Sequence, residues 1–131
     1  MNRVHECFQE KINALQRNRY FQGLGADLIE QLAEDTHLYQ FGTGDPVLWE
    51  EEPCQGLYIV KEGRVKLFRC SETGREMIVK IMGPGDTFNE VPVLDGLGNP
   101  VNVTAIDTCL IWVVRADTIR TLTEMHPEAS Q

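Results

Sequence analysis

The stretch that decides the fold reads Gly85-Asp86-Thr87-Phe88-Asn89-Glu90-Val91-Pro92-Val93. Its Gly-Asp pair predicts a turn, because both residue types favour turn conformations. The aromatic Phe88 and the acidic Glu90 then open a short apolar segment that contains a proline, which is tolerated in the first turn of a helix. The stretch therefore predicts a tight turn followed by a short helix.

Short candidate strands lie on both sides of this stretch. They are divided by turn segments such as 42–45, 71–74 and 82–86, which are rich in glycine, serine and aspartate. In the segment 76–81 the apolar residues alternate with others, so we expect that strand to bury one face, formed by Met77, Val79 and Ile81. Many short strands at regular turn spacing predict an antiparallel sandwich or jelly roll. The candidate strands are 38–41, 46–49, 57–61, 64–70, 76–81, 101–105 and 110–114.

Helical patterns flank the strands. Apolar residues recur at helical spacing from Val4 to Leu15, again over 27–33, and a last helix is expected over 116–125. We therefore predict an α+β fold: an antiparallel β jelly roll (a double-stranded β-helix) with N-terminal helices, a short internal helix and a closing C-terminal helix. Residues 1–20 are expected to form a helical arm, and residues 21–131 the jelly-roll domain.

Composition restricts the function. The 131 residues suit one globular domain, and twelve basic against twenty acidic residues give a formal net charge of −8. Such a balance argues against direct binding of nucleic acid, where phosphate neutralisation supplies most of the affinity. The longest apolar run, 109–114, is far shorter than the ~20 residues of a membrane helix. The polar N-terminal residues do not resemble a signal peptide, so we expect a cytoplasmic protein.

Two motifs stand out together. One is Leu57-Tyr58-Ile59-Val60-Lys61-Glu62-Gly63-Arg64-Val65-Lys66-Leu67-Phe68, and the other is Gly83-Pro84-Gly85-Asp86-Thr87-Phe88 followed by Glu90. Together they resemble the effector domain of the Crp/Fnr family of bacterial transcription regulators, which has the fold of a cyclic-nucleotide-binding domain. The resemblance covers residues 21–127 and implies a sensor domain with a role in transcription regulation. The ligand-binding residues that it implies are Phe88, Asn89, Glu90, Val91, Asn99, Pro100 and Val101.

The anion anchor of this family is missing. In members that bind cyclic AMP, the short helix meets the phosphate with backbone N–H groups, and an Arg-Ser or Arg-Thr pair neutralises its charge. Here that pair reads Asn99-Pro100, and residues 81–114 contain no lysine or arginine. Removing one member of a buried charge pair costs about 2 to 5 kcal/mol, which weakens a phosphate ligand by roughly thirty- to several-thousandfold. Cyclic AMP is therefore not the ligand that we expect.

Two site residues have alternative explanations. Glu90 either contacts a ligand inside the roll or satisfies backbone N–H groups at the start of the short helix. The Asn99-Pro100 dipeptide either lines a pocket for an uncharged ligand or simply forms a turn, and we favour the turn because Asn-Pro is a strong turn dipeptide.

Cofactor and catalytic patterns are scarce. The three histidines are far apart and the four cysteines have no paired short spacing, so neither a zinc site nor an iron–sulfur cluster is expected. Haem or another redox group is kept as an alternative, with His37, Cys7 and Cys54 as candidate ligands. We expect no enzyme, because the sequence has no catalytic triad with motif context, no Walker loop and no dinucleotide fingerprint.

The resemblance also implies partners. In Crp/Fnr regulators a long helix after the roll forms a homodimer and a helix-turn-helix domain reads DNA, while a small-molecule effector controls both. The start of that helix would fall near Pro127, so we expect the chain to be a piece of a longer regulator, without the dimerisation helix and the DNA-binding domain, and with no contact to a membrane. The alternative is a stand-alone interaction or dimerisation module without a small-molecule ligand.

Overall fold

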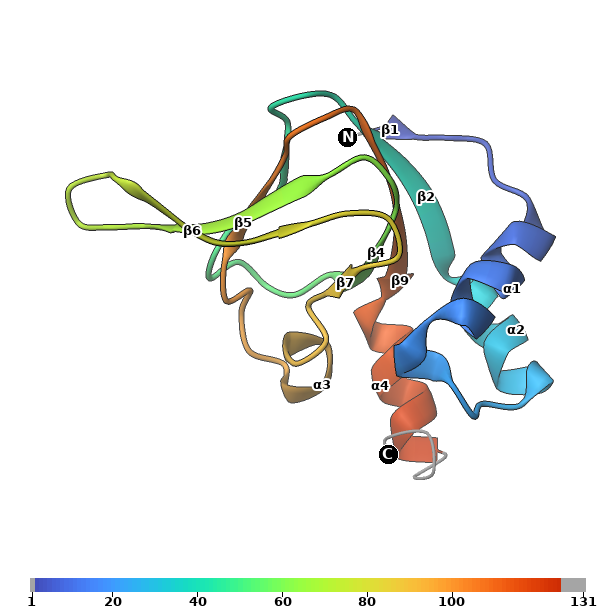
Figure 1. The fold of residues 1–131 in the computed structure, drawn as a ribbon. Helices are drawn as coiled ribbons and strands as arrows, with labels where there is room; N and C mark the ends of the chain where they lie inside the picture. The colour runs from blue at the N-terminus through green and yellow to red at the C-terminus, as the bar shows by residue number, and fades with distance from the viewer. Residues whose placement is uncertain (1, 126–131) are drawn as a thin grey trace.

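The computed structural model describes residues 2–125 and folds them into two antiparallel sheets that face each other (Figure 1). The predicted antiparallel jelly roll is confirmed. In the five-stranded sheet the order is β1 (Asn2–Arg3), β2 (Thr36–Phe41), β9 (Cys109–Arg115), β4 (Gly56–Glu62) and β7 (Thr87–Phe88). In the four-stranded sheet the order is β3 (Pro46–Leu48), β8 (Asn102–Ala105), β5 (Val65–Cys70) and β6 (Glu76–Met82).

Helices gather on one side of the roll (Figure 1). They are α1 (Phe8–Arg17), the 3-10 turn η1 (Arg19–Phe21), α2 (Ala26–Glu34) and α4 (Ala116–Met125), whereas α3 (Pro92–Asp95) lies between β7 and β8. The last helix has the bounds that the sequence predicted. Val4 lies outside α1, because its N–H donates to Leu38 of β2. The helix expected to start near Pro127 lies outside the described residues.

Two apolar clusters meet at β4 and β9. Tyr58 and Val60 face the space between the sheets, whereas Leu57 and Ile59, on the other face of β4, pack with the helices. This arrangement explains why residues 57–60 read as an uninterrupted apolar run, since both faces of the strand are buried. Within residues 2–125 no helix is both long and apolar enough to cross a membrane.

The prediction for the strand over 76–81 is wrong in one respect. Met77, Val79 and Ile81 of β6 are 52%, 56% and 49% exposed, so the strand buries neither face. The physical reason is its place at the edge of the four-stranded sheet, in a hairpin with β5 that projects from the roll (Figure 1). Alternation along a strand predicts which side chains share a face, but it does not show that another layer covers that face.

A charged network fastens the N-terminal arm to the roll. The Glu6 carboxylate lies 2.7 Å from the buried Lys11 ammonium and 2.9 Å from Nδ1 of His37, and it accepts a hydrogen bond from the Leu38 N–H. Burial alone would raise the pKa of Glu6, but these partners together with Arg3 lower it to about 2. The carboxylate therefore stays charged and holds the segment before α1 against β2.

Candidate ligand-binding site

The turn at 83–86 is docked on β4. The Gly85 N–H donates to the Val60 carbonyl at 2.8 Å, and the Val60 N–H donates to the Asp86 carbonyl at 2.9 Å. The Asp86 side chain closes the turn by accepting from the Gly83 N–H at 2.9 Å. These bonds position the start of β7, where the rings of Phe88 and Tyr58 stack with centroids 5.0 Å apart. The predicted Gly-Asp turn thus fixes where the following segment enters the roll.

Asn89 turns the chain from β7 toward α3. Its φ is +69°, a left-handed conformation that asparagine adopts more readily than most residues. Its carbonyl then accepts a hydrogen bond from the Val93 N–H at 3.3 Å. The predicted short helix follows as α3 and begins at Pro92, whose missing N–H costs nothing at that place.

Asn89 and Asn99, ten residues apart, meet inside the protein. The Asn89 amide donates to the Asn99 side-chain oxygen at 2.9 Å, and both residues are buried. The Asn99 amide in turn donates to the Trp49 carbonyl at 2.9 Å. Its backbone pairs with the segment 51–52 through two further hydrogen bonds, of 2.8 and 2.9 Å. Asn99 is therefore a fixed, fully bonded residue that joins the α3 segment to the loop after β3.

The other predicted site residues divide by burial. Phe88 and Val101 are buried, while Val91 is 70% exposed and Pro100 lies at the surface. Glu90 is exposed and makes no side-chain hydrogen bond with the described residues, so nothing supports the capping role. Burial raises the pKa of the nearby Tyr20, and the negative charge of Glu90 adds to the effect. Glu90 therefore faces the surface beside Tyr20.

Two arginines that the sequence analysis did not consider reach this segment from other elements. Arg69 of β5 donates from Nε to the Pro100 carbonyl at 3.1 Å, and Arg120 of α4 donates from Nε to the Val93 carbonyl at 2.9 Å. Both arginines lie outside residues 81–114, the segment that contains no lysine or arginine. Arg69 is exposed and lies one residue beyond Phe68, the last β5 residue that pairs with β8, so strand alternation gave no signal for this contact.

A cavity of ≈ 370 Å³ lies between the two sheets next to Asn99. Aromatic side chains line much of it, namely Tyr39, Tyr58 and Trp49, and Glu52 and Arg115 add one charge of each sign. Burial raises the pKa of Tyr58 to about 12, so its hydroxyl stays neutral and can donate a hydrogen bond. The volume and the mixture of aromatic walls with a few polar groups are typical of sites for small molecules.

The candidate haem ligands stand in different surroundings. His37 is bonded to Glu6, Cys7 is exposed at the start of α1, and Cys54 lies 3.7 Å from the Asn89 amide. Burial raises the pKa of the Cys54 thiol. Residues 2–125 contain no group of three or more His, Cys, Asp or Glu side chains that could hold a metal ion.

Comparison with known proteins identifies the fold and the family. The model of the cyclic nucleotide-binding domain matches residues 38–126. The chain belongs to the cyclic nucleotide-binding domain family. It is 32% identical over 117 residues to the CRP-like cAMP-activated global transcriptional regulator of Mycobacterium tuberculosis, an alignment that covers 89% of this chain and 52% of that protein. The chain therefore spans about half of the length of this relative.

Solved structures agree. The N-terminal domain of a transcriptional regulator from Streptomyces coelicolor superposes with a TM-score of 0.75 at 26% identity, covering 89% of this chain and 82% of that one. The sensor domain of the regulator DNR from Pseudomonas aeruginosa superposes with a TM-score of 0.82 at 22% identity, covering 93% and 83% respectively. The resemblance to the effector domain of Crp/Fnr regulators is thereby confirmed.

Proposed function

We propose that this chain is the sensor domain of a cytoplasmic Crp/Fnr-type transcription regulator, and that its effector is not cyclic AMP. The observation that carries the proposal is the Asn89–Asn99 amide pair, bonded at 2.9 Å. By the sequence resemblance, Asn99 takes the position of the arginine that anchors the phosphate in members that bind cyclic AMP. Neutral amides satisfy each other there but cannot neutralise a phosphate, whereas a guanidinium makes strong charge-assisted bonds to it.

The neighbouring cavity supports an uncharged effector. It reaches Asn99 and offers the neutral Tyr58 hydroxyl together with aromatic walls. A small, uncharged aromatic or heterocyclic molecule would bury its apolar surface there and exchange hydrogen bonds with these polar groups. Glu90, exposed beside Tyr20, takes no part in this site in the conformation described.

The contact between α3 and α4 gives such a ligand a route to the rest of a regulator. Val93 of α3 is fully buried in the same cluster as Ile119 and Leu122 of α4, and Arg120 bonds its carbonyl. A ligand that displaces the bonds of Asn99 would shift α3 and therefore bias the position of α4. In the full regulator, the segment after α4 would carry this shift to the homodimer contact and the DNA reader.

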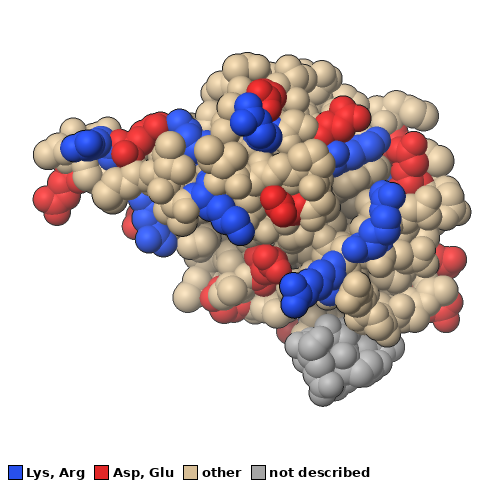
Figure 2. Space-filling view, viewed as in Figure 1, with Lys and Arg blue, Asp and Glu red and all other residues tan. Residues whose placement is uncertain are grey.

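DNA contact is assigned to a separate domain of the full regulator. The net charge of −8 opposes nucleic-acid binding by this chain. Figure 2 shows Lys and Arg interspersed with Asp and Glu on the face that it presents, without the continuous basic stripe that a DNA-binding surface needs.

A calorimetric titration with cyclic AMP and then cyclic GMP tests the proposal, with the cAMP-activated regulator of M. tuberculosis as the positive control. The chain is expected to give no heat of binding at about 1 mM nucleotide. A Kd of about 1 mM corresponds to a binding free energy of about −4.1 kcal/mol. Micromolar binding would overturn the proposal. In that case the variants Arg69→Gln and Arg120→Gln would show which arginine replaces the missing anchor.

A further inference from the structure

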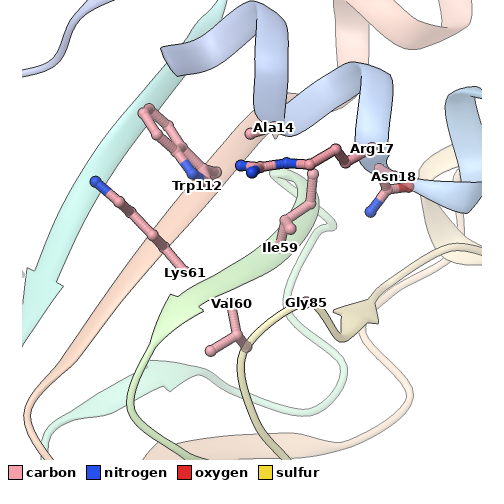
Figure 3. A pocket seen from close by; sticks show the side chains of 8 residues that line it. All are labelled: Ala14, Arg17, Asn18, Ile59, Val60, Lys61, Gly85 and Trp112. Atoms are coloured by element: carbon pink, nitrogen blue, oxygen red, sulfur yellow. The ribbon is translucent and has the colours of Figure 1, made fainter.

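A second hollow lies outside the roll, between α1 and the outer face of the five-stranded sheet (Figure 3). Its volume is ≈ 270 Å³, and it shares no residue with the cavity between the sheets. Ala14, Ile59 and Trp112 form its apolar part, and Arg17, Asn18 and Lys61 form its polar part. The hollow exists because the α1 residue that faces the sheet here is an alanine, which is too short to fill the space.

Both charged side chains around the hollow are basic. Figure 3 shows Arg17 extending from α1 across the hollow toward Trp112, while Lys61 rises from β4 on the other side of the indole. The Lys61 ammonium lies 5.5 Å from the centre of the indole ring. None of the described lining residues is acidic, although the chain carries a net charge of −8. The hollow therefore carries a local positive charge, although the chain as a whole is negative.

These cations are weakly neutralised by the protein itself. Among residues 2–125 Arg17 has no ion-pair partner. Lys61 pairs with Glu10 at 3.3 Å, but the Glu10 side chain is 55% exposed. Such exposed pairs are worth at most about 1 kcal/mol and yield readily to a better anion.

We propose that this hollow binds a small organic anion with a flat apolar body. The planar guanidinium of Arg17 matches a carboxylate or phosphate group with two parallel N–H donors, and the Lys61 ammonium adds a second positive charge. The apolar body lies against Ile59 and the edge of Trp112. A hollow of ≈ 270 Å³ is slightly smaller than the usual range for drug-sized ligands, so it suits a molecule with a single ring.

The occupant also contacts the path to the candidate site between the sheets. The Asn18 amide donates to the Thr87 hydroxyl at 2.7 Å, and Gly85 lines the hollow. Thr87 and Gly85 both belong to the segment 85–88, which leads directly into Asn89. An anion bound to Arg17 would therefore tie α1 to this segment and fix its position.

Fluorescence of Trp112 provides the test. The chain has two tryptophans, so the variant Trp49→Phe leaves Trp112 as the sole reporter. This protein is titrated with benzoate and with phenyl phosphate, and with benzamide as a neutral molecule of the same shape as benzoate. We expect a saturable change with at least one of the two anions, and none with benzamide. The anion that binds more tightly identifies the preferred head group.

Three further variants assign the site. Loss of a charge-assisted hydrogen bond in Arg17→Gln or Lys61→Gln is expected to weaken binding by about ten- to a hundredfold. Ala14→Leu is expected to abolish binding by filling the hollow while both cations remain. Arg19→Gln, an exposed basic residue that does not line the hollow, is the matched control and should leave the affinity unchanged. Circular dichroism verifies that each variant is folded.

Three outcomes would overturn the proposal: no saturable change with either anion up to tens of millimolar, equal affinity for benzamide, or an Arg17→Gln protein that binds as the parent does. These outcomes can be distinguished from those of the cyclic AMP titration, because the two cavities share no lining residue and the Arg17→Gln, Lys61→Gln and Ala14→Leu variants alter only the hollow.

Discussion

Glu6→Gln offers a quantitative test of the network that fastens the N-terminal arm. The carboxylate has an ordinary pKa of 4.5, and its partners lower that pKa to about 2 in the folded protein. The Glu6 side chain is only 12% exposed, so solvent screens these contacts weakly. One pKa unit corresponds to about 1.4 kcal/mol, and the difference therefore corresponds to about 3 kcal/mol of folding free energy. This figure already includes the loss of the partner of the buried Lys11 ammonium, because Lys11 is one of the groups that lower the pKa.

The pH dependence has a definite sign. Because the pKa of Glu6 is lower in the folded than in the unfolded state, its contribution is fully present above pH 4.5 and is lost as the pH falls toward 2. Urea unfolding followed by circular dichroism should therefore show Glu6→Gln about 3 kcal/mol less stable than the parent at pH 7, with the gap narrowing below pH 4.5. Glu10→Gln, which breaks an exposed pair with Lys61, is the control and should cost less than about 1 kcal/mol. A Glu6→Gln protein as stable as this control, or a stability difference that does not change with pH, would show that the Glu6 carboxylate does not stabilise the fold.

Three further variants probe the fold and the candidate site by the same unfolding assay. Gly74→Ala, at a φ of +82° in open space, should lower the free energy of unfolding by about 1 to 2 kcal/mol. Gly63→Ala has a similar φ of +83° but would also place a Cβ 2.5 Å from the Thr108 carbonyl, so it should cost at least about 1 kcal/mol more. Equal costs for the two variants would contradict this. Asn99→Leu removes the hydrogen bonds of Asn99 with the Asn89 amide and the Trp49 carbonyl, which keep only weaker partners in the Cys54 sulfur at 3.7 Å and the Glu52 N–H at 3.4 Å. It should therefore cost about 1 kcal/mol for each bond lost, and a neutral result would mean that the amide pair is not formed. Val79→Thr on the exposed β6 should stay within about 0.5 kcal/mol of the parent, whereas Val103→Thr buries a hydroxyl in the roll and should cost about 1 to 3 kcal/mol.

The sequence predicted the bounds of the helices and strands better than their burial and their pairing. Turn residues and strand alternation placed the strands of the roll close to their observed bounds, and the last helix has its predicted bounds. The two-residue strands β1 and β7 were not predicted, because so short a segment has no periodicity and is defined only by its partners, β2 and β4. The exposure of β6 was missed for the same reason, since burial depends on what packs against a strand.

In the candidate site, too, the sequence predicted which residues lie in the segment but not all of their tertiary contacts. The resemblance predicted Asn89 and Asn99 as candidate ligand-binding residues; the fold brings them into contact at 2.9 Å, and their binding role stays a prediction. It did not indicate that Glu90 points to the surface or that Arg69 reaches Pro100 from β5. Contacts between residues 31 positions apart depend on strand register, and a search along one segment does not include register. A resemblance to a motif therefore located the segment, but the tertiary contacts decide which groups stand beside it.

Our proposed function requires that the site has lost its preference for a phosphate. The most direct test is the ratio of the affinities for cyclic AMP and adenosine, measured by calorimetry on the same protein. Adenosine keeps the base and the ribose but carries no charge. We expect cyclic AMP to bind no more tightly than adenosine, including the case in which neither gives heat at millimolar concentration. A preference for cyclic AMP of about thirtyfold or more, equivalent to about 2 kcal/mol, would show that an anion anchor is present and would contradict the account.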